Sequence, residues 1–216
     1  TSGSTGQPKG VMIEHFSLLN ILFALQQEYP LLEDDVFLFK TTYTFDVSLT
    51  EIFGWILGGG KLAILEPEAE KDPHQLWEAI IKYGVTHINF VPSMLSPFVD
   101  FVAEKAQSNK LRYIFSAGEA ISADLVKKIY QVFPDIKLEN IYGPTESTIY
   151  ATKYSLPKDH LGSLVPIGKP LANIHAFILN KHYQLQPIGV PGELCLAGAG
   201  LARGYLNNAE LTKASF

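Results

Sequence analysis

The sequence has little cysteine and no cluster of positive charge. Its single cysteine, Cys195, excludes an internal disulfide framework and is typical of a reducing compartment. There are 17 lysines and arginines against 22 aspartates and glutamates, with no basic run, which disfavours nucleic-acid and anionic-membrane partners. The longest apolar stretches, such as residues 52–60, are too short to span a bilayer. These absences predict a cytoplasmic protein with no nucleic-acid or membrane partner.

Two further signals are missing. The six histidines are scattered, without i,i+4 pairs or cysteine neighbours, so the sequence offers no zinc motif. Residues 1–6 contain no initiator methionine, basic region or apolar run, so they are neither a signal peptide nor an ordinary start. We therefore expect an excised segment of a longer chain.

What is present indicates a folded domain. Of the 216 residues, 47% are hydrophobic and 18% are charged, which is typical of globular proteins. A chain of this length buries roughly 70% of its unfolded surface on folding, so it needs no disulfide or structural metal.

Runs rich in β-branched and aromatic residues alternate with amphipathic runs, which predicts an α/β fold. Layered sheets flanked by helices are expected over residues 1–165. Residues 166–216 are rich in glycine and proline turns and predict the start of a β-rich subdomain without long helices. The expected strands are residues 36–42, 61–65, 86–91, 111–115, 138–142, 174–179 and 192–197.

Capping residues mark three of the expected helices. One is expected to begin at Ser48, with Glu51 completing a capping box, and to end in the glycines at 58–60. A second is expected from Asp72, followed by a proline at the first helical position, up to residue 84. A third is expected from about Ser122.

The first segment with chemical character is residues 1–10, TSGSTGQPKG. Glycines allow backbone N–H groups to approach an anion, hydroxyls add donors and Lys9 adds a positive charge, so the composition suits a polyphosphate. The spacing is not that of a P-loop, because Lys9 follows Gly6 by three positions and precedes Gly10. A flexible glycine-serine linker is the alternative.

A second segment, residues 140–148 (NIYGPTEST), follows a buried strand. In open α/β sheets ligands bind at that strand edge, and a tyrosine, a threonine and an acidic side chain are a plausible nucleotide set. A Gly-Pro turn with a solvated glutamate is the alternative. The third segment, residues 192–206, contains G-x-G but no following helix pattern, so tight β-turn packing explains it better than dinucleotide binding.

Taken together, these segments resemble the adenylate-forming enzymes, and among them the amino-acid adenylation domains of non-ribosomal peptide synthetases. The strings T-S-G-S-T-G-x-P-K-G, Y-G-P-T-E and G-E-L-x-L-x-G-x-G-L-A-R-G-Y-L occur in the family's order and at its approximate spacing. The resemblance covers residues 1–216. It implies the large N-terminal subdomain of this family, followed by the start of a barrel-like subdomain.

The resemblance also assigns sites. It implies ATP and Mg²⁺ as cofactors, with Lys9, Thr145 and Glu146 acting in catalysis and Glu146 holding the metal. Phe45 and Asp46 would open the substrate pocket, where Asp46 pairs with the α-ammonium of an amino acid. The ATP-binding residues implied are Thr1, Ser2, Gly3, Ser4, Thr5, Gly6, Lys9, Gly118, Tyr142, Gly143 and Thr145. The substrate-binding residues implied are Phe45, Asp46, Val47, Thr50, Asn89, Phe115, Ala117, Ile141, Ile149 and Tyr150.

The reaction implied is attack of an amino-acid carboxylate on the α-phosphorus of ATP, giving aminoacyl-AMP and pyrophosphate. The aminoacyl group would then pass to the phosphopantetheine thiol of a peptidyl carrier protein, beside neighbouring synthetase domains. The family's ribose-binding aspartate and lid lysine would lie beyond Phe216, so residues 1–216 alone are expected to be inactive. No pocket wall residue is ionisable near neutral pH, which predicts a neutral, medium-sized side chain, with or without a hydroxyl or amide, or else an aromatic one.

Two alternatives remain at this point. One is an acyl-CoA or aryl-acid ligase of the same superfamily, but such an enzyme has no ammonium to pair with Asp46, whose unpaired burial costs several kcal/mol. The other is a nucleotide-binding module without catalysis.

Overall fold

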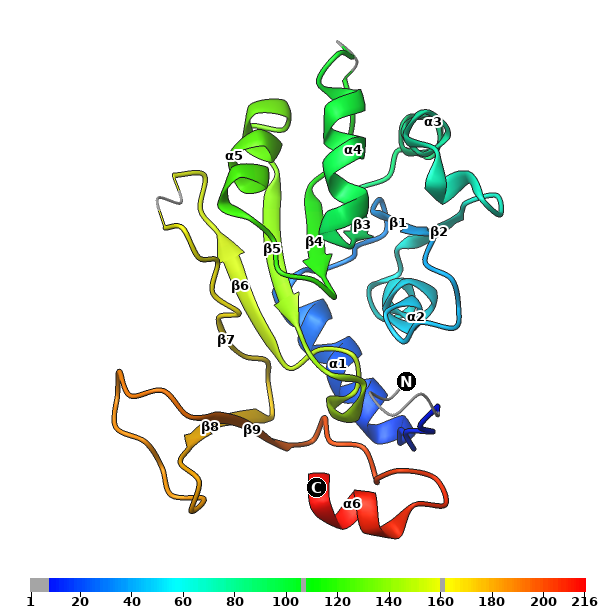
Figure 1. Ribbon diagram of the computed structural model, residues 1–216. Coiled ribbons are helices and arrows are strands. Elements are labelled where there is room, and N and C mark those ends of the chain that lie inside the picture. Colours follow the sequence, from blue (N-terminus) through cyan, green and yellow to red (C-terminus); the bar gives the residue numbers. More distant parts are fainter. Residues whose placement is uncertain (1–7, 106–107, 160–161) are drawn as a thin grey trace.

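A mixed sheet forms the centre of the computed structural model, which describes residues 8–105, 108–159 and 162–216 (Figure 1). In these residues the strand order is β2-β1-β3-β4-β5-β6-β7. Strands β1 to β5 pair in parallel, whereas β6 and β7 pair antiparallel. The strands are β1 (Val36–Phe39), β2 (Lys61–Ile64), β3 (His87–Phe90), β4 (Tyr113–Ala117), β5 (Lys137–Tyr142), β6 (Thr152–Leu156) and β7 (Lys169–Pro170).

Helices cover both faces of the sheet, because successive strand residues point to opposite faces. On one face α3, α4 and α5 pack against a core that contains Leu38, Ile88 and Ile114. On the other face α1 and α2 pack beside Phe37 and Phe115. The helices are α1 (His15–Glu28), α2 (Ser48–Gly58), α3 (Pro73–Tyr83), α4 (Pro92–Val102) and α5 (Ala123–Val132).

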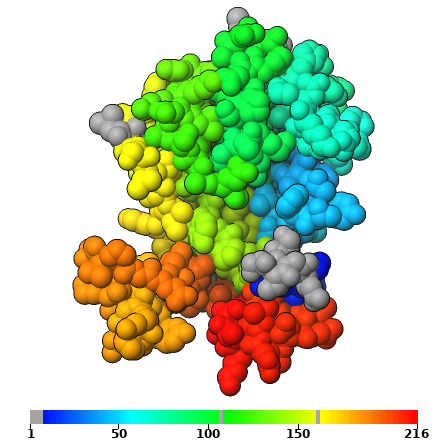
Figure 2. Space-filling view, viewed as in Figure 1, coloured from blue at the N-terminus to red at the C-terminus, as the bar shows by residue number. Residues whose placement is uncertain are grey.

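A β-hairpin and a short helix follow the sheet. Strands β8 (Ile174–Leu179) and β9 (Glu193–Gly198) pair antiparallel, and α6 (Ala209–Ser215) ends the chain. In the space-filling view the hairpin (orange) and the C-terminal residues (red) lie at the end of the molecule opposite α4 (Figure 2). Among the described residues, no helix combines the length and hydropathy that a membrane crossing requires.

The expected α/β architecture is confirmed. The Asp72 carboxylate accepts a hydrogen bond from the His74 N–H at 2.9 Å, and the Ser122 hydroxyl accepts one from the Leu125 N–H at 3.2 Å. Gly59 ends α2 in the left-handed conformation. Helices α1 and α4 were not among the sequence expectations.

One local expectation is wrong. Ser48 and Glu51 do not form a capping box, because the residue before the helix is Val47 and no side chain caps it. The Ser48 hydroxyl instead donates to the Phe45 carbonyl at 2.6 Å. The Glu51 carboxylate is fully buried and faces the loop after β1.

Candidate functional site

A large cavity lies where the parallel strands end. It has a volume of about 550 Å³, and its walls are residues that end or follow β1, β3, β4 and β5. The carboxyl ends of parallel strands meet at one edge of a sheet, which is where ligands bind in open α/β folds. We call this space the main cavity.

Most of the residues expected at the substrate pocket line the main cavity. Eight of the ten do so: Phe45, Asp46, Val47, Asn89, Ala117, Ile141, Ile149 and Tyr150. Two expected nucleotide residues, Gly118 and Gly143, share the same walls. The arrangement therefore places the expected amino-acid and nucleotide positions around one space.

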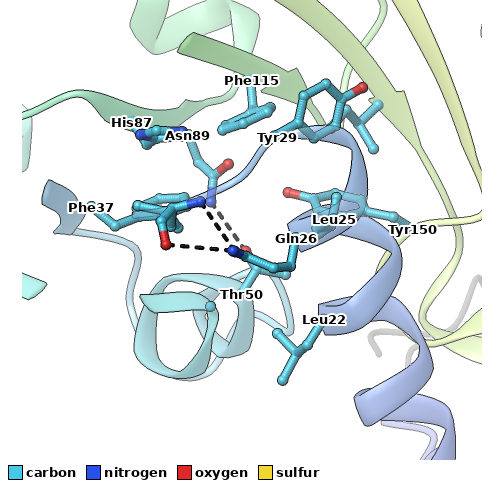
Figure 3. Close-up of a pocket in the computed structure, with 13 residues that line it drawn as sticks. Leu22, Leu25, Gln26, Tyr29, Phe37, Thr50, His87, Asn89, Phe115 and Tyr150 are labelled. Atoms are coloured by element: carbon cyan, nitrogen blue, oxygen red, sulfur yellow. Dashed lines mark hydrogen bonds between the residues drawn. The ribbon is translucent and has the colours of Figure 1, made fainter. Parts of the chain in front are cut away.

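The remaining two expected substrate residues lie deeper. Thr50 and Phe115 line a second space, the inner cavity, with a volume of about 30 Å³ between α1, α2 and the sheet (Figure 3). Asn89, Ile141 and Tyr150 line both cavities. The inner cavity thus lies beneath the expected substrate pocket.

Asp46 accepts a hydrogen bond from a residue of the segment 140–148. The Thr145 hydroxyl donates a hydrogen bond to Asp46 Oδ2 at 2.6 Å, although the two residues are 99 positions apart. Asp46 is half-buried, and its neighbour Phe45 is 66% exposed. This contact links the loop after β1 to the segment after β5, and it fixes one oxygen of the carboxylate while the other has no hydrogen-bond partner among the described residues.

Glu51 organises the same loop. Its Oε2 accepts the backbone N–H groups of Lys40 at 3.0 Å and Thr41 at 2.9 Å, and its Oε1 accepts the Thr41 hydroxyl at 2.7 Å. Asn89 Nδ2 donates to Glu51 Oε1 at 3.2 Å. A buried carboxylate requires such donors, since a carboxylate without partners would be strongly destabilising.

Sequence reasoning also missed a half-buried lysine in the main cavity. Lys40 lines the cavity, and its Nζ lies 4.8 Å from the centroid of the Phe90 ring. Burial lowers the pKa of Lys40, while the nearby carboxylates of Glu51 and Glu70 act in the opposite direction. Glu70 and Lys71 line this end of the cavity too. The expected strand 36–42 runs through Lys40, so the position of Lys40 directly after β1 could not be seen from the sequence.

The segment after β5 has an unusual backbone. Thr148 and Ile149 have φ values of 59° and 71°, in the left-handed region that β-branched residues rarely adopt. The Thr148 hydroxyl donates to the Gly200 carbonyl at 2.6 Å, and the Ala202 N–H donates to the Glu146 carbonyl at 2.8 Å. Strain of this kind persists only where surrounding structure enforces it, and it clusters at functional sites.

Glycine is required at Gly143. A Cβ there would lie 2.6 Å from the Ile149 carbonyl oxygen. The loop can therefore close on itself only because this position has no side chain. Gly118, which directly follows β4, has φ of +83°, which also favours glycine.

The three sequence segments meet at the C-terminal part of the chain. Backbone hydrogen bonds join Met12 to Arg203 and Gly204. The Tyr205 hydroxyl donates to Glu146 Oε1 at 2.6 Å, and Lys9 Nζ lies 5.6 Å from the centroid of the Tyr205 ring. Tyr205 was not singled out from the sequence, where its segment predicted only turn packing.

Some expected nucleotide residues lie elsewhere. Lys9 lines a separate surface cavity of about 300 Å³ together with Tyr205. Tyr142 ends β5 with 38% of its surface exposed, and neither Tyr142 nor Glu146 lines the main cavity. The segment Thr1, Ser2, Gly3, Ser4, Thr5 and Gly6 lies outside the described residues.

The carboxylate that Glu146 offers would suit an Mg²⁺ ion whose other ligands come mainly from a nucleotide and water. Mg²⁺ usually takes one or two carboxylates and completes its shell with water and phosphate oxygens. Glu146 offers one carboxylate beside the strand edge, and only its Oε1 is engaged, by Tyr205. In the part of the chain that the structure describes, no three histidine, cysteine, aspartate or glutamate side chains gather as a metal cage.

Comparison with known proteins places this architecture in a family. The family model described as AMP-binding enzyme matches residues 1–206. Over the full chain the sequence is 69% identical to a linear gramicidin synthase of Brevibacillus parabrevis, and it spans 4% of that protein. It is also 44% identical to a mycosubtilin synthase of Bacillus subtilis over the full chain and 9% of that protein.

Similar solved structures also belong to nonribosomal peptide synthetases. A crystal structure of the nonribosomal peptide synthetase FmoA3, in its α-methyl-L-serine-AMP-bound form, superposes with a TM-score of 0.90 at 27% identity. The match covers 98% of this chain and 24% of that one. FmoA3 also has an AMPPNP-bound form with the same TM-score. The chain therefore belongs to the AMP-binding enzyme family, and over its whole length it matches adenylation domains of nonribosomal peptide synthetases.

Proposed function

We propose that the domain containing this chain activates an amino acid as aminoacyl-AMP, using ATP and Mg²⁺, for transfer to a carrier-protein phosphopantetheine thiol. The chain spans only 4% of the gramicidin synthase relative, so this statement concerns the larger protein. The observation that supports it most is the position of Asp46, which shares the main cavity with Gly118 and Gly143.

Asp46 is the residue that would recognise an amino acid. A carboxylate in a half-closed cavity gains from pairing with an ammonium, whereas a fatty or aryl acid offers it no cation. Thr145 holds Asp46 Oδ2 from the nucleotide side, so the same contact would set the distance between the amino acid and the nucleotide. Holding two reactants in one geometry is a large part of the catalysis of such reactions.

The other residues would neutralise the phosphate charge and let the nucleotide lie close to the backbone. Gly118 and Gly143 carry no side chain, so backbone groups there can lie close to a nucleotide. Glu146 would hold Mg²⁺, which neutralises phosphate charge when bound. Tyr205 donates to the other side of that carboxylate and would keep it oriented toward the metal. Lys9, with Thr1–Gly6, would meet the phosphates.

The test is ATP–pyrophosphate exchange by the intact domain. A panel of amino acids is compared with the matching carboxylic acids that lack the α-amino group. We expect exchange only with the amino acids. Exchange driven equally well by the acids would assign the domain to the acyl or aryl-acid ligases, and exchange with neither would indicate a nucleotide-binding module without catalysis.

A further inference from the structure

The inner cavity contains polar atoms that protein groups do not satisfy. The Tyr150 hydroxyl is buried close to Thr50, but among the described residues it makes no hydrogen bond of good geometry. Nε2 of His87, whose side chain also lines this cavity, is likewise buried without a partner. Buried polar groups without partners are rare, and each calls for an explanation such as a bound group.

Hydrogen-bond directions fix the orientation of the Asn89 amide. Its Nδ2 donates to Glu51 Oε1 at 3.2 Å and to Thr50 Oγ1 at 3.3 Å. The Glu51 carboxylate can only accept, and the Thr50 hydroxyl uses its proton on the Val47 carbonyl at 2.8 Å. Both amide protons of Asn89 are therefore committed to these two acceptors.

The amide oxygen of Asn89 is consequently left for a ligand. Among the described residues it has no hydrogen-bond partner. Figure 3 shows it on the side away from Thr50, directed into the space that the Tyr150 hydroxyl also faces. The inner cavity thus presents an acceptor at its boundary with the main cavity, in a volume suited to a group the size of a water molecule.

The inner cavity does not suit a charged group. Its lining contains no carboxylate. Burial lowers the pKa of His87 to about 4, so this ring is neutral at pH 7. A carboxylate placed here would meet the negative charges of Glu51 and Asp46, which act on Tyr150, and an ammonium would lose its hydration without a carboxylate in the lining to contact. The group that fits is small, neutral and able to donate a hydrogen bond.

We propose that Glu51 is a specificity-positioning residue, which holds the Asn89 amide so that its oxygen selects a neutral amino-acid side chain ending in a hydroxyl or an amide NH₂. This inference rests on the proposed function. It narrows the substrate to donor-bearing side chains and assigns a role to a residue that contacts Asn89 rather than the substrate.

The first test compares near-isosteric amino acids in the exchange assay on the intact domain, such as threonine with valine and glutamine with methionine. We expect the donor-bearing member of at least one pair to be favoured about tenfold or more in kcat/KM, since polar sites reject analogues that lack the group they bind. If amino acids are activated but the hydrocarbon members are equal or better, this inference is overturned and the proposed function stands. If no amino acid is activated, both are overturned.

The second test is Glu51→Gln, which changes polarity without changing shape. The carbonyl oxygen of the introduced glutamine can still accept the N–H groups of Lys40 and Thr41, so the loop remains held. Its NH₂ would face the Asn89 NH₂, so two donors would meet and the Asn89 amide would lose the fixed orientation that directs its oxygen into the inner cavity. We expect the preference for the donor-bearing side chain to fall about tenfold, with KM for ATP unchanged.

The matched control is Glu33→Gln, the same chemical change at an exposed position, which should leave the preference unchanged. If Glu51→Gln does not fold, Asn89→Leu removes the acceptor directly and should abolish the preference. A preference that survives in a folded Glu51→Gln or Asn89→Leu protein would overturn the inference.

Discussion

Replacing Asp46 tests the amino-acid site most directly. Asp46→Ala removes the carboxylate that would pair with the substrate ammonium and leaves the Thr145 hydroxyl without its 2.6 Å partner. Truncating one member of a buried charge pair costs about 2–5 kcal/mol. Because Asp46 is half-buried rather than fully buried, we expect the lower part of that range. This corresponds to a loss of about 2–3 kcal/mol, or roughly 30-fold to 150-fold in kcat/KM for the amino acid.

The assay is ATP–pyrophosphate exchange at varied amino-acid concentration, with ATP binding measured separately by calorimetry. Asp46→Asn is the control, because it keeps an oxygen that can accept from Thr145 but loses the negative charge. A similar loss in both variants would assign the effect to charge. Activity of Asp46→Asn close to wild type, or a loss confined to ATP binding, would refute the pairing.

Three further outcomes follow from the packing. Ile114→Ala, in the fully buried core, should destabilise the domain by about 2–5 kcal/mol in urea unfolding, and a value below about 1 kcal/mol would contradict the assigned core. Gly143→Ala forces a Cβ to within 2.6 Å of the Ile149 carbonyl oxygen, so Tm and exchange should both fall, whereas Gly54→Ala, inside α2 and with ordinary contacts, should not lower Tm. Burial lowers the pKa of His87 from 6.5 to about 4, so the unfolded state binds this proton more tightly. Stability should therefore decrease as pH falls from 6.5 toward 4, and His87→Gln should flatten this dependence by up to about 3 kcal/mol, which urea unfolding at several pH values would measure.

The architecture was predictable because periodicity and capping are local properties. The helix from Asp72 and the strand 174–179 follow directly from residue types along the chain. Helices α1 and α4 were not predicted from the sequence, because α1 begins without a side-chain cap and α4 contains Pro97 in its interior. Local rules therefore recover elements whose ends carry a distinct signal.

The site was predictable only in part, for a physical reason. Resemblance located the residues around the main cavity, but Glu51 was assigned to a helix cap because Ser48 stands three positions before it. The partners it actually uses, Lys40, Thr41 and Asn89, are between 10 and 38 positions away. No local pattern encodes contacts of that range, and the same holds for Tyr205 and Glu146, which are 59 positions apart.

The left-handed pair at Thr148 and Ile149 has a consequence for how the protein is made. Hydrogen bonds to the following segment hold this loop, because the Thr148 hydroxyl donates to the Gly200 carbonyl and the Ala202 N–H donates to the Glu146 carbonyl. During synthesis, a ribosome-bound chain can complete the seven-stranded sheet before these later residues emerge from the exit tunnel. The loop that lines the main cavity would then adopt its strained form only after residue 202 is free to dock. We therefore expect a nascent chain to fold its sheet before its binding site, with ligand affinity appearing only once the β-rich segment has docked.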